Sequence, residues 1–382
     1  MLKVMIIGAG GIAPAHIKGY LAFPEQVEIT VIANPTPARA RKLISEYRLE
    51  AECTENYENR LSEVDIVSIC TPPETHKDIA VKALQAGTHV LLEKPMARSL
   101  QECDEIIAAS EESGAELSVV AQSRFISSIH KVVSIIHERK YGKLLFSQVN
   151  SFWYRGQNYY DLYWRGLWDK EGGGCTLNHG VHHIDLLLWA KGMPQEIISV
   201  ISNLNHDNSE EEDISLTILK YPDGTLGQIN CSLLHHGEVQ KFDFQMEKAG
   251  ISIPFAVTAS SSRSNGFPLE NAEIIDEIKN RYDAIADLEY EHHTGQIENF
   301  LGSIADGKSL LMDGTEGRKS VELITGIYKS GFTGKPVRLP LSDNDPYYSF
   351  NGRIADAVRF NEKSRTVRVF DDTSITSFEG KF

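Results

Sequence analysis

A glycine-rich turn near the start of the chain constrains its fold more than any other feature of the sequence. The turn, Gly8-Ala9-Gly10-Gly11-Ile12-Ala13, follows the apolar run 2–7 and precedes helix-like periodicity in 12–23. Its first glycine permits a tight turn, its second lets backbone N–H groups approach a pyrophosphate, and Ala13 allows close helix–strand packing. An ordinary βα turn is the alternative, but the context favours a dinucleotide site. The residues predicted to contact the dinucleotide here are Gly8, Gly10, Gly11 and Ile12.

The rest of the first third alternates between strand-like and helix-like segments. Strands are expected at 27–33, 64–70, 88–92 and 116–121, and helices at 38–48, 75–86 and 99–113. Repeated strand–helix–strand order indicates a parallel sheet with helices on both faces. We therefore predict an α/β protein whose residues 1–122 form a doubly wound Rossmann domain.

From residue 123 onward, strand-like stretches follow one another with little helix between them. Strands are expected at 143–153, 196–204, 213–220, 224–233 and 240–246, and helices at 178–190, 292–306 and 315–331. Tyr221-Pro222-Asp223-Gly224 has the composition of a hairpin turn, and 259–268 that of a polar loop. The pattern predicts an α+β domain over 123–341 with a mostly antiparallel open sheet. Residues 342–382 form a C-terminal extension without long periodicity.

Composition excludes several classes of protein. A length of 382 residues predicts two or three domains, and 41% apolar with 24% charged residues is typical of a globular chain. The net charge of −15 argues against a nucleic-acid or membrane-surface partner, and no apolar run approaches the roughly 18 residues of a membrane span. Five scattered cysteines without a CxxC pair, and no signal-peptide pattern, predict reduced thiols and a cytoplasmic location.

Asn34 ends the second predicted strand, where a residue that binds the adenosine ribose is expected. An aspartate there would hold the ribose diol of NAD and repel the 2′-phosphate of NADP. Asparagine is neutral, and the next residues, Pro35-Thr36-Pro37, include no arginine. NAD is therefore favoured as the cofactor, with NADP not excluded.

Two further motifs follow predicted strands, at the carboxyl edge where ligands bind to a doubly wound sheet. One is Cys70-Thr71-Pro72-Pro73-Glu74-Thr75-His76, and the other is Glu93-Lys94-Pro95. A lysine held beside a proline at a strand end is a plausible catalytic cation, and a surface lysine is the alternative.

A fourth motif combines three glycines with a histidine-rich helix in the segment 171–185. Asn178 and His182 are four residues apart, so they share a face of the predicted helix, and Asp185 can also reach His182. Histidine has the right pKa to remove a proton from an alcohol near neutral pH. A helix cap, a polar surface and a metal site are the alternatives. Because no third ligand follows at clear spacing, no metal is expected.

An aromatic and polar segment over 152–160 suits a carbohydrate ligand. Flat rings such as that of Tyr154 can cover the C–H groups of a sugar, while amides and arginine bind its hydroxyls. An aromatic strand end with a purely structural role is the alternative.

Taken in order, these motifs resemble the Gfo/Idh/MocA family, named after glucose–fructose oxidoreductase, inositol dehydrogenase and rhizopine catabolism proteins. The resemblance rests on GxGxxA at the N-terminus, CTPPxxH, EKP, and a glycine triplet followed by GVHxxD. It continues through His293-Thr294-Gly295-Gln296 and Asp313-Gly314 to Leu339-Pro340-Leu341, and it covers residues 1–341.

The resemblance implies roles for single residues. Lys94, whose bond to Pro95 is often cis in relatives, matches the catalytic lysine, and His182 matches the catalytic histidine. Asn178 stands where many members have an aspartate, a departure that puts an inositol substrate in doubt. As a catalytic and substrate residue, Asn178 is expected to orient the substrate hydroxyl or the imidazole. Trp164-Arg165 matches a pair near the substrate and the cofactor. The positions that line the dinucleotide site in the family are Thr71, Pro72, His76, Glu93 and Gln122.

The resemblance also implies an enzyme that oxidises a secondary alcohol of a sugar, sugar derivative or cyclitol by hydride transfer to NAD. His182 would take the hydroxyl proton, and Lys94 would stabilise negative charge on the same oxygen. Relatives associate through the open face of the second-domain sheet, so a homodimer or homotetramer is expected. The alternatives are an NAD-dependent glycosidase with transient oxidation, an enzyme like biliverdin reductase or dihydrodiol dehydrogenase, and a non-enzymatic NAD(P)-sensing regulator.

Overall fold

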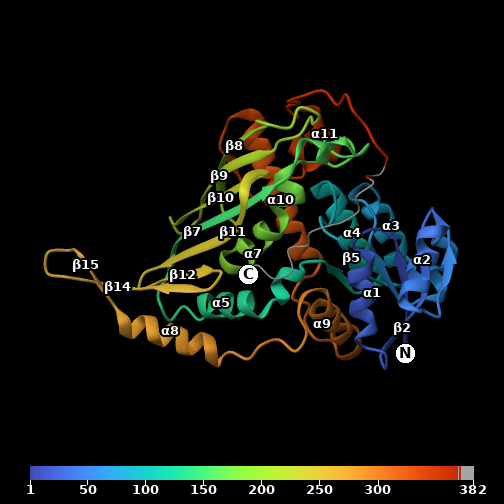
Figure 1. The fold of residues 1–382 in the computed structure, drawn as a ribbon, viewed down its shortest axis with the longest axis horizontal. Coiled ribbons are helices and arrows are strands. Elements are labelled where there is room, and N and C mark those ends of the chain that lie inside the picture. Colours follow the sequence, from blue (N-terminus) through green and yellow to red (C-terminus); the bar gives the residue numbers. More distant parts are fainter. Residues whose placement is uncertain (369, 371–382) are drawn as a thin grey trace. The chain divides into compact units, whose positions relative to one another are not determined.

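The computed structural model describes residues 1–368 and residue 370. The chain divides into two compact units, each discontinuous in sequence (Figure 1). The first unit comprises Met1–Phe125 and Leu288–Val321, and the second comprises Ile126–Asp287 and the residues from Glu322 onward. This division differs from the predicted one, in which 123–341 is a single uninterrupted domain.

Helix α9 (His292–Asp306) explains why a late segment joins the first unit. Its apolar residues Ile297, Phe300 and Leu301 are buried in one core with Ile17 and Tyr20 of helix α1 (Ala13–Leu21). Burial of these side chains stabilises the docked helix in proportion to the apolar area removed from water. The sequence shows the periodicity of α9 but not the surface on which it packs.

A parallel sheet of six strands forms the centre of the first unit, in the order β3-β2-β1-β4-β5-β6. The strands are β1 (Leu2–Ile7), β2 (Val27–Ala33), β3 (Glu52–Thr54), β4 (Ile66–Ile69), β5 (His89–Leu92) and β6 (Leu117–Val119). The order reverses at β1, which is the doubly wound arrangement, so the predicted Rossmann fold is confirmed. Only β3 is missing from the sequence prediction, because its three residues include no apolar run.

Helices connect these strands and fix which loops share an edge. They are α1, α2 (Pro37–Tyr47), α3 (His76–Gln85) and α4 (Leu100–Ser113), with the short 3₁₀ helices η1 (Glu58–Glu63), η2 (Pro73–Thr75) and η3 (Gln122–Phe125). Because parallel strands end at the same edge, the loops after β1, β4 and β5 lie together. These loops carry Gly8, Thr71 and Lys94.

The second unit is built around a sheet of eight strands, in the order β13-β12-β11-β7-β10-β9-β8-β16. The strands are β7 (Leu144–Tyr154), β8 (Glu196–Ser202), β9 (Ile214–Lys220), β10 (Leu226–Ser232), β11 (Leu234–Met246), β12 (Gly250–Ile253), β13 (Ala256–Thr258) and β16 (Val337–Arg338). Strands β7 and β10 pair in parallel, whereas the other described pairs of this sheet are antiparallel. The predicted mostly antiparallel sheet is therefore confirmed.

The helical parts of the second unit differ from the prediction in several places. They are α5 (Ser127–His137), η4 (Gln157–Asp161), α6 (Cys175–Asn178), α7 (Val181–Lys191), α8 (Ala272–Ala284), η5 (Pro346–Tyr348) and α11 (Phe350–Ala355), together with the end of α10 (Gly314–Thr333). Helices α5 and α8 are absent from the prediction, which places one helix where α6 and α7 lie. No helix within the described residues is long and apolar enough to cross a membrane.

The predicted polar loop 259–268 contains part of a two-stranded hairpin instead. Its strands are β14 (Ser260–Ser262) and β15 (Pro268–Glu270), and the hairpin extends away from the large sheet in Figure 1. All six residues of these strands are exposed. Backbone pairing and side-chain hydrogen bonds from Ser261 and Arg263 hold the hairpin, and neither leaves a periodic apolar signal in the sequence.

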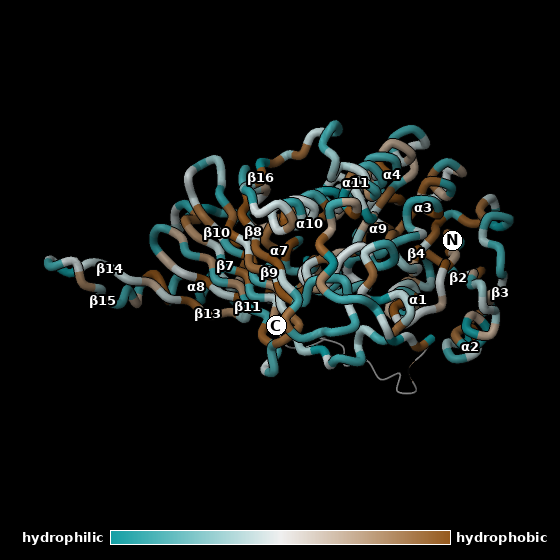
Figure 2. Tube along the Cα trace, turned by 90° about the horizontal axis from the view of Figure 1, so that it is seen from above, coloured by the Kyte–Doolittle hydropathy of each residue, from teal (hydrophilic) through white to brown (hydrophobic). Residues whose placement is uncertain are grey.

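One side of the large sheet leaves aliphatic side chains exposed. Val200 of β8 is 66% exposed, and Leu216 and Ile218 of β9 are about half exposed. The alternate residues of β9, Ser215 and Thr217, point the other way and are buried. Figure 2 shows hydrophobic stretches along β8, β9 and β10. These side chains form an exposed apolar stripe on this face of the sheet.

Candidate active site

The glycine turn after β1 has two differently placed glycines. Gly8 has φ +101°, and a Cβ there would lie 2.6 Å from the backbone oxygen of Cys70, so only glycine fits. A Cβ on Gly10, in contrast, would meet nothing within 4 Å. Helix α1 begins after Ile12 without a side-chain cap. An uncapped helix N-terminus beside open space suits the pyrophosphate of a dinucleotide, so the turn fits the predicted cofactor.

Asn34 fixes this turn to the end of β2. Its Oδ1 accepts a hydrogen bond from the backbone N–H of Ala9 (3.0 Å), and its Nδ2 donates to the backbone oxygen of Thr36 (2.9 Å). The residue predicted to contact the ribose thus also holds the glycine turn. It places an uncharged amide at the position where an aspartate would repel a 2′-phosphate.

His76 connects the loops that follow β4 and β5. Its Nδ1 lies 2.9 Å from the backbone oxygen of Pro95, and its Nε2 lies 2.9 Å from the backbone oxygen of Thr71. Burial lowers the pKa of this imidazole, which is fully buried. His76 thus braces the backbone of both loops, and its predicted place in the lining of the dinucleotide site stays a prediction. The Lys94–Pro95 bond in the braced loop is cis, as the resemblance implied.

A buried carboxylate holds the backbone of Lys94. Glu93 Oε2 accepts from the backbone N–H of Lys94 (3.1 Å), while Oε1 lies 2.9 Å from His16 Nε2 and 3.5 Å from His293 Nε2. Burial alone would raise the pKa of Glu93, but the hydrogen bond with His16 and the nearby imidazole of His293 hold it well below its usual range. His16 also contacts Ser68 Oγ through Nδ1 (2.7 Å). Glu93 is thus a charged anchor for the loop that carries Lys94.

The same cluster has the donor types of a metal site. Nitrogen and oxygen atoms of His16, Glu93 and His293 lie within 4.8 Å of one another, and transition metals take such ligands. Glu93 is hydrogen-bonded to His16 and to the backbone N–H of Lys94, whereas the buried Nε2 of His293, 3.5 Å from Glu93 Oε1, has no hydrogen-bond partner among the described residues. The prediction missed His16, whose only signal is a histidine on the buried face of α1.

Two glutamines lie where β6 ends. Gln296 of α9 accepts from the backbone N–H of Ala121 through Oε1 (2.8 Å) and donates to the backbone oxygen of Val119 through Nε2 (2.7 Å). Next to Ala121, the buried Oε1 of Gln122 has no hydrogen-bond partner among the described residues. A buried acceptor without a partner is costly, and a bound ligand that donates a hydrogen bond would satisfy it.

In the second unit, the helix predicted at 178–190 is broken. Asn178 ends α6, and Gly180 precedes α7, so Asn178 and His182 do not lie on one continuous helix. The argument from four-residue spacing is therefore wrong. Asn178 Nδ2 instead donates to the backbone oxygens of Gly173 (2.5 Å) and Gly174 (3.3 Å).

The histidines of this segment differ in environment. His182 is partly exposed, whereas His183 is buried, and its Nδ1 lies 3.0 Å from Ser151 Oγ. Burial lowers the pKa of His183 to about 4, so it is neutral near physiological pH. His179 is buried beside the rings of Trp153 and Tyr159. Partial exposure leaves His182 as the histidine of the three best placed to meet a ligand.

The glycine triplet packs against the protein itself. A Cβ on Gly174 would overlap the backbone oxygen of Glu212, and one on Gly173 would overlap the Tyr328 hydroxyl. The Glu212 carboxylate accepts from the backbone N–H groups of Gly174 (3.1 Å) and Thr176 (2.9 Å). This buried acid therefore occupies the start of α6, where a ligand anion would otherwise bind.

Arg165 lies at the centre of an aromatic and acidic cluster. Its guanidinium is 4.2 Å from the ring centroids of both Trp164 and Tyr159, and its Nη1 donates to Glu171 Oε1 (2.6 Å). Tyr154, a second aromatic residue predicted to contact the substrate, is 44% exposed and stacks on His236. The two aromatic residues among the predicted substrate contacts, Trp164 and Tyr154, thus belong to separate ring contacts.

Comparisons with known proteins agree with this architecture. The profile of the oxidoreductase family with an NAD-binding Rossmann fold matches residues 2–121, and that of the GFO/IDH/MocA C-terminal domain matches 129–252. The WlbA dehydrogenase from Bordetella pertussis, solved in complex with NADH and UDP-GlcNAcA, is 25% identical with a TM-score of 0.77. That match covers 89% of this chain and 98% of that one.

Curated relatives include enzymes of more than one reaction type. D-glucoside 3-dehydrogenase of Escherichia coli is 21% identical over 88% of this chain and 97% of that protein. The 2,7-anhydro-N-acetylneuraminate hydratase of Mediterraneibacter gnavus is 23% identical over 63% of this chain. The chain spans 60% and 65% of the length of two of the curated relatives it matches. Both family profiles, in their expected order on the expected folds, show that the chain belongs to the Gfo/Idh/MocA oxidoreductases and carries an NAD-binding Rossmann domain.

Proposed function

We propose that the protein is an NAD-dependent dehydrogenase that oxidises a secondary alcohol of a sugar, sugar derivative or cyclitol. The observation that carries the proposal is the shared edge of the first unit. There the glycine turn opens beside the uncapped α1, and a buried, charged Glu93 anchors the backbone of Lys94. A lysine whose backbone is anchored beside a dinucleotide site suits the stabilisation of charge on an alcohol oxygen.

The cofactor and the individual residues have different roles in the reaction. NAD, when bound, supplies the hydride acceptor. Lys94 donates a hydrogen bond to the reacting hydroxyl and stabilises negative charge on its oxygen, and His182 accepts the hydroxyl proton. Asn178, held by the glycine triplet, is an uncharged neighbour in sequence and adds no carboxylate to this machinery.

The predicted cofactor contacts are proposals of the same kind. In the first unit they are Gly8, Gly10, Gly11, Ile12, Asn34, Thr71, Pro72, Glu93, Lys94 and Gln122, with His76 as a brace; in the second unit the contact is Arg165. The unpartnered oxygen of Gln122 supports this set most directly. Tyr154 and Trp164 present the flat rings that a sugar would contact.

A screen of inositols, hexoses, glycosides and sugar acids tests the proposal. Purified protein and NAD are mixed with each compound, and NADH formation is followed by absorbance. We expect a member of these classes to yield NADH with the wild type and far less with Lys94→Ala. Turnover by Lys94→Ala at the wild-type rate would contradict the assigned role of the lysine.

The relationship to a hydratase favours a second candidate, an enzyme that oxidises its substrate only transiently. Such an enzyme would release a changed sugar while NAD returns to its starting state. The two candidates differ in one quantity, the ratio of NADH formed to product released. A ratio near one indicates a dehydrogenase, and product without NADH indicates the transient mechanism.

We also propose a homodimer or homotetramer that forms through the open face of the large sheet. Val200, Leu216 and Ile218 are exposed there on neighbouring strands, and Val200 lies opposite Leu216 in the β8–β9 register. Burial of such a stripe against a second copy removes apolar area from water. Leu216→Glu with Ile218→Glu should yield monomers by light scattering. An unchanged mass would exclude this face.

We also propose that the protein is located in the cytoplasm. All five cysteines are free thiols, and four of them are buried. Burial raises the pKa of Cys70 and Cys175, which keeps these thiols protonated and unreactive.

A further inference from the structure

The C-terminal extension is hydrogen-bonded to the second unit along its described length. The backbone N–H of Phe360 donates to the backbone oxygen of Glu210 (3.0 Å), and that of Val367 donates to the backbone oxygen of Asp161 (2.6 Å). Residues 358–367 are named the C-terminal strap here. The strap follows the part of the chain that carries the family resemblance, and the sequence offers no periodic signal for it.

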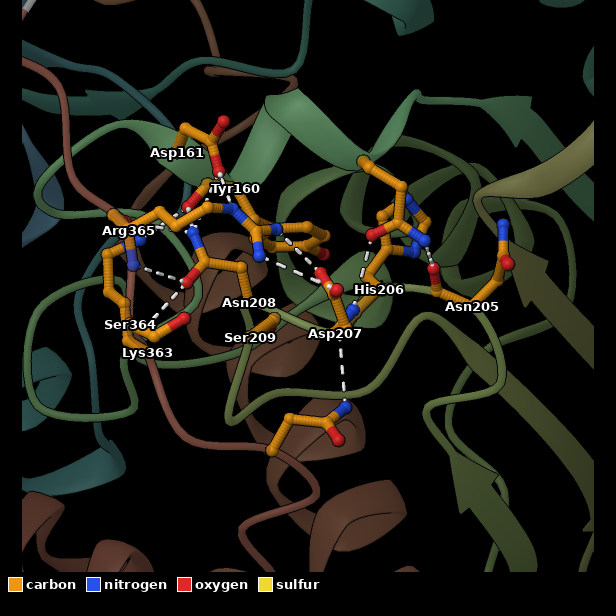
Figure 3. Close-up of polar contacts among 12 residues, drawn as sticks. Tyr160, Asp161, Asn205, His206, Asp207, Asn208, Ser209, Lys363, Ser364 and Arg365 are labelled. Carbon is orange, nitrogen blue, oxygen red and sulfur yellow. Dashed lines mark hydrogen bonds and ion pairs between the residues drawn. The ribbon is translucent and has the colours of Figure 1, made fainter.

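Asn208 ties the strap to the loop that it covers. This side chain is 1% exposed, and its Oδ1 accepts from the backbone N–H groups of Ser364 (2.8 Å) and Arg365 (2.9 Å). Its Nδ2 donates to Asp161 Oδ1 (2.8 Å) and to the backbone oxygen of Arg365 (2.8 Å). Figure 3 shows these residues gathered around Asn208. A buried amide with its donors and acceptors satisfied in this way fixes the position of the strap.

Lys363 joins the two ends of the loop 160–165. Its Nζ donates to the backbone oxygen of Tyr160 and to that of Arg165 (2.9 Å). Between these ends, the backbone N–H of Tyr163 donates to the backbone oxygen of Val367 (3.0 Å). The loop is thus held at both ends by one ammonium group and in its middle by the strap backbone.

Charge supports the same contact. Burial lowers the pKa of Lys363, while Asp161, Glu171 and Glu211 act in the opposite direction. Glu171 also pairs with Arg165, so the lysine and the arginine share an acidic surrounding. Hydrogen bonds from a charged donor are stronger than neutral ones, so the two bonds from Lys363 contribute strongly to the hold of the strap on this loop.

The loop carries residues with a proposed ligand-binding role. Trp164 and Arg165 belong to it, and the stacked Arg165 guanidinium depends on the loop backbone for its position. Its carbonyl oxygen is one of the two that Lys363 holds. The strap therefore acts on the backbone of the residue assigned to cofactor binding in the second unit.

We propose that the C-terminal strap, through Lys363, positions the Trp164–Arg165 pair and thereby sets the affinity for the nicotinamide dinucleotide. The inference rests on the proposed function, from which it takes the role of Arg165. A loop held in its binding conformation loses less entropy when the ligand binds, so release of the loop weakens binding without changing any contact. Lys363 is a positioning residue in this scheme and touches no ligand.

The test compares full-length wild type with Lys363→Met, Lys363→Arg and the matched control Lys335→Met, which removes an exposed lysine of the same unit. Amide hydrogen exchange of residues 160–165 measures how readily this loop opens. Fluorescence titration with NADH measures the dissociation constant of the cofactor. For Lys363→Met we expect faster exchange in this loop and about tenfold weaker NADH binding, with the protein still folded and only a small fall in the thermal midpoint. Lys363→Arg should restore both values, and Lys335→Met should match the wild type.

The outcomes separate the inference from the function on which it rests. Unchanged loop exchange in Lys363→Met overturns the inference, whatever the affinity. Suppose that Lys363→Met shows faster loop exchange but unchanged NADH binding. If Arg165→Ala then binds NADH more weakly than the wild type, the positioning role of Lys363 is overturned. If Arg165→Ala binds NADH like the wild type, the assigned role of Arg165 fails instead, and the positioning proposal falls with it.

Two truncations provide an independent comparison. A chain that stops after Arg368 retains the strap, and a chain that stops after Ala357 lacks it. We expect the shorter chain to bind NADH at least about tenfold more weakly than the longer one. Equal dissociation constants for the two chains would overturn the proposal.

Discussion

The two glycine-rich turns of this protein are similar in sequence and opposite in surroundings. At Gly10, in the first unit, a side chain would enter open space next to an uncapped helix. At Gly173 and Gly174, in the second unit, a side chain would collide with Tyr328 and Glu212. One turn leaves room for a ligand, whereas the other is filled by the protein. The same residue type therefore serves binding in one unit and packing in the other.

The largest expected effect concerns the turn at Gly173 and Gly174, where the protein itself fills the space. Gly174→Ala should destabilise the second unit by about 3 kcal/mol or more, because the new methyl group overlaps the backbone oxygen of Glu212. The thermal midpoint measures this loss. Gly10→Ala is the matched control: it should unfold like the wild type and bind NADH poorly. Equal midpoints for both variants would remove the distinction between the turns.

The next effect concerns Lys94, at the edge of the first unit where the dinucleotide is proposed to bind. Lys94→Ala should lower kcat by about 10²-fold, because a donor to the developing charge is lost. Its thermal midpoint should stay near the wild-type value, since Glu93 anchors the backbone and not the side chain of Lys94. Steady-state kinetics and a thermal scan on the same preparation check both statements. A large fall in the midpoint would assign the lysine to packing instead.

His183 offers a pH-dependent test of the packed region. Its folded-state pKa of about 4 lies below the unfolded value of about 6.5, so the unfolded chain binds more protons between these values. The contribution of the neutral imidazole is complete above pH 6.5 and is lost as the pH falls towards 4.

His183→Gln should remove this dependence. Between pH 7 and pH 5, we expect the wild type to lose about 2 kcal/mol more stability than the variant. Urea unfolding at the two pH values gives the difference. A variant with the same acid sensitivity as the wild type would show that His183 is not the buried titrating group.

The smallest expected effect concerns cofactor choice. Asn34→Asp should shift the preference towards NAD by about tenfold, through repulsion of the 2′-phosphate of NADP. The aspartate can still accept from the N–H of Ala9, so the glycine turn should persist. Dissociation constants for NADH and NADPH measure the shift. A preference that moves towards NADPH would place another residue at the ribose.

Local patterns predicted most of the first unit and less of the second. Buried parallel strands such as β1 and β4 are continuous apolar runs, which are visible without any knowledge of their neighbours. Helices α5 and α8 and the serine-rich hairpin lack so plain a signal. In the candidate site, Lys94 follows from a strand end, whereas His16 acquires its role only through contact with Glu93.

The sequence by itself determined the Rossmann domain, the glycine turn and the family, because these depend on residue types at fixed short spacings. Tertiary structure decided which groups fill the second glycine turn, where the His182 helix breaks, and which unit α9 joins. It also decided that a C-terminal lysine holds the carbonyl of Arg165, far away in the sequence. Such contacts depend on burial and on partners distant in the chain, and short-range periodicity carries no record of either.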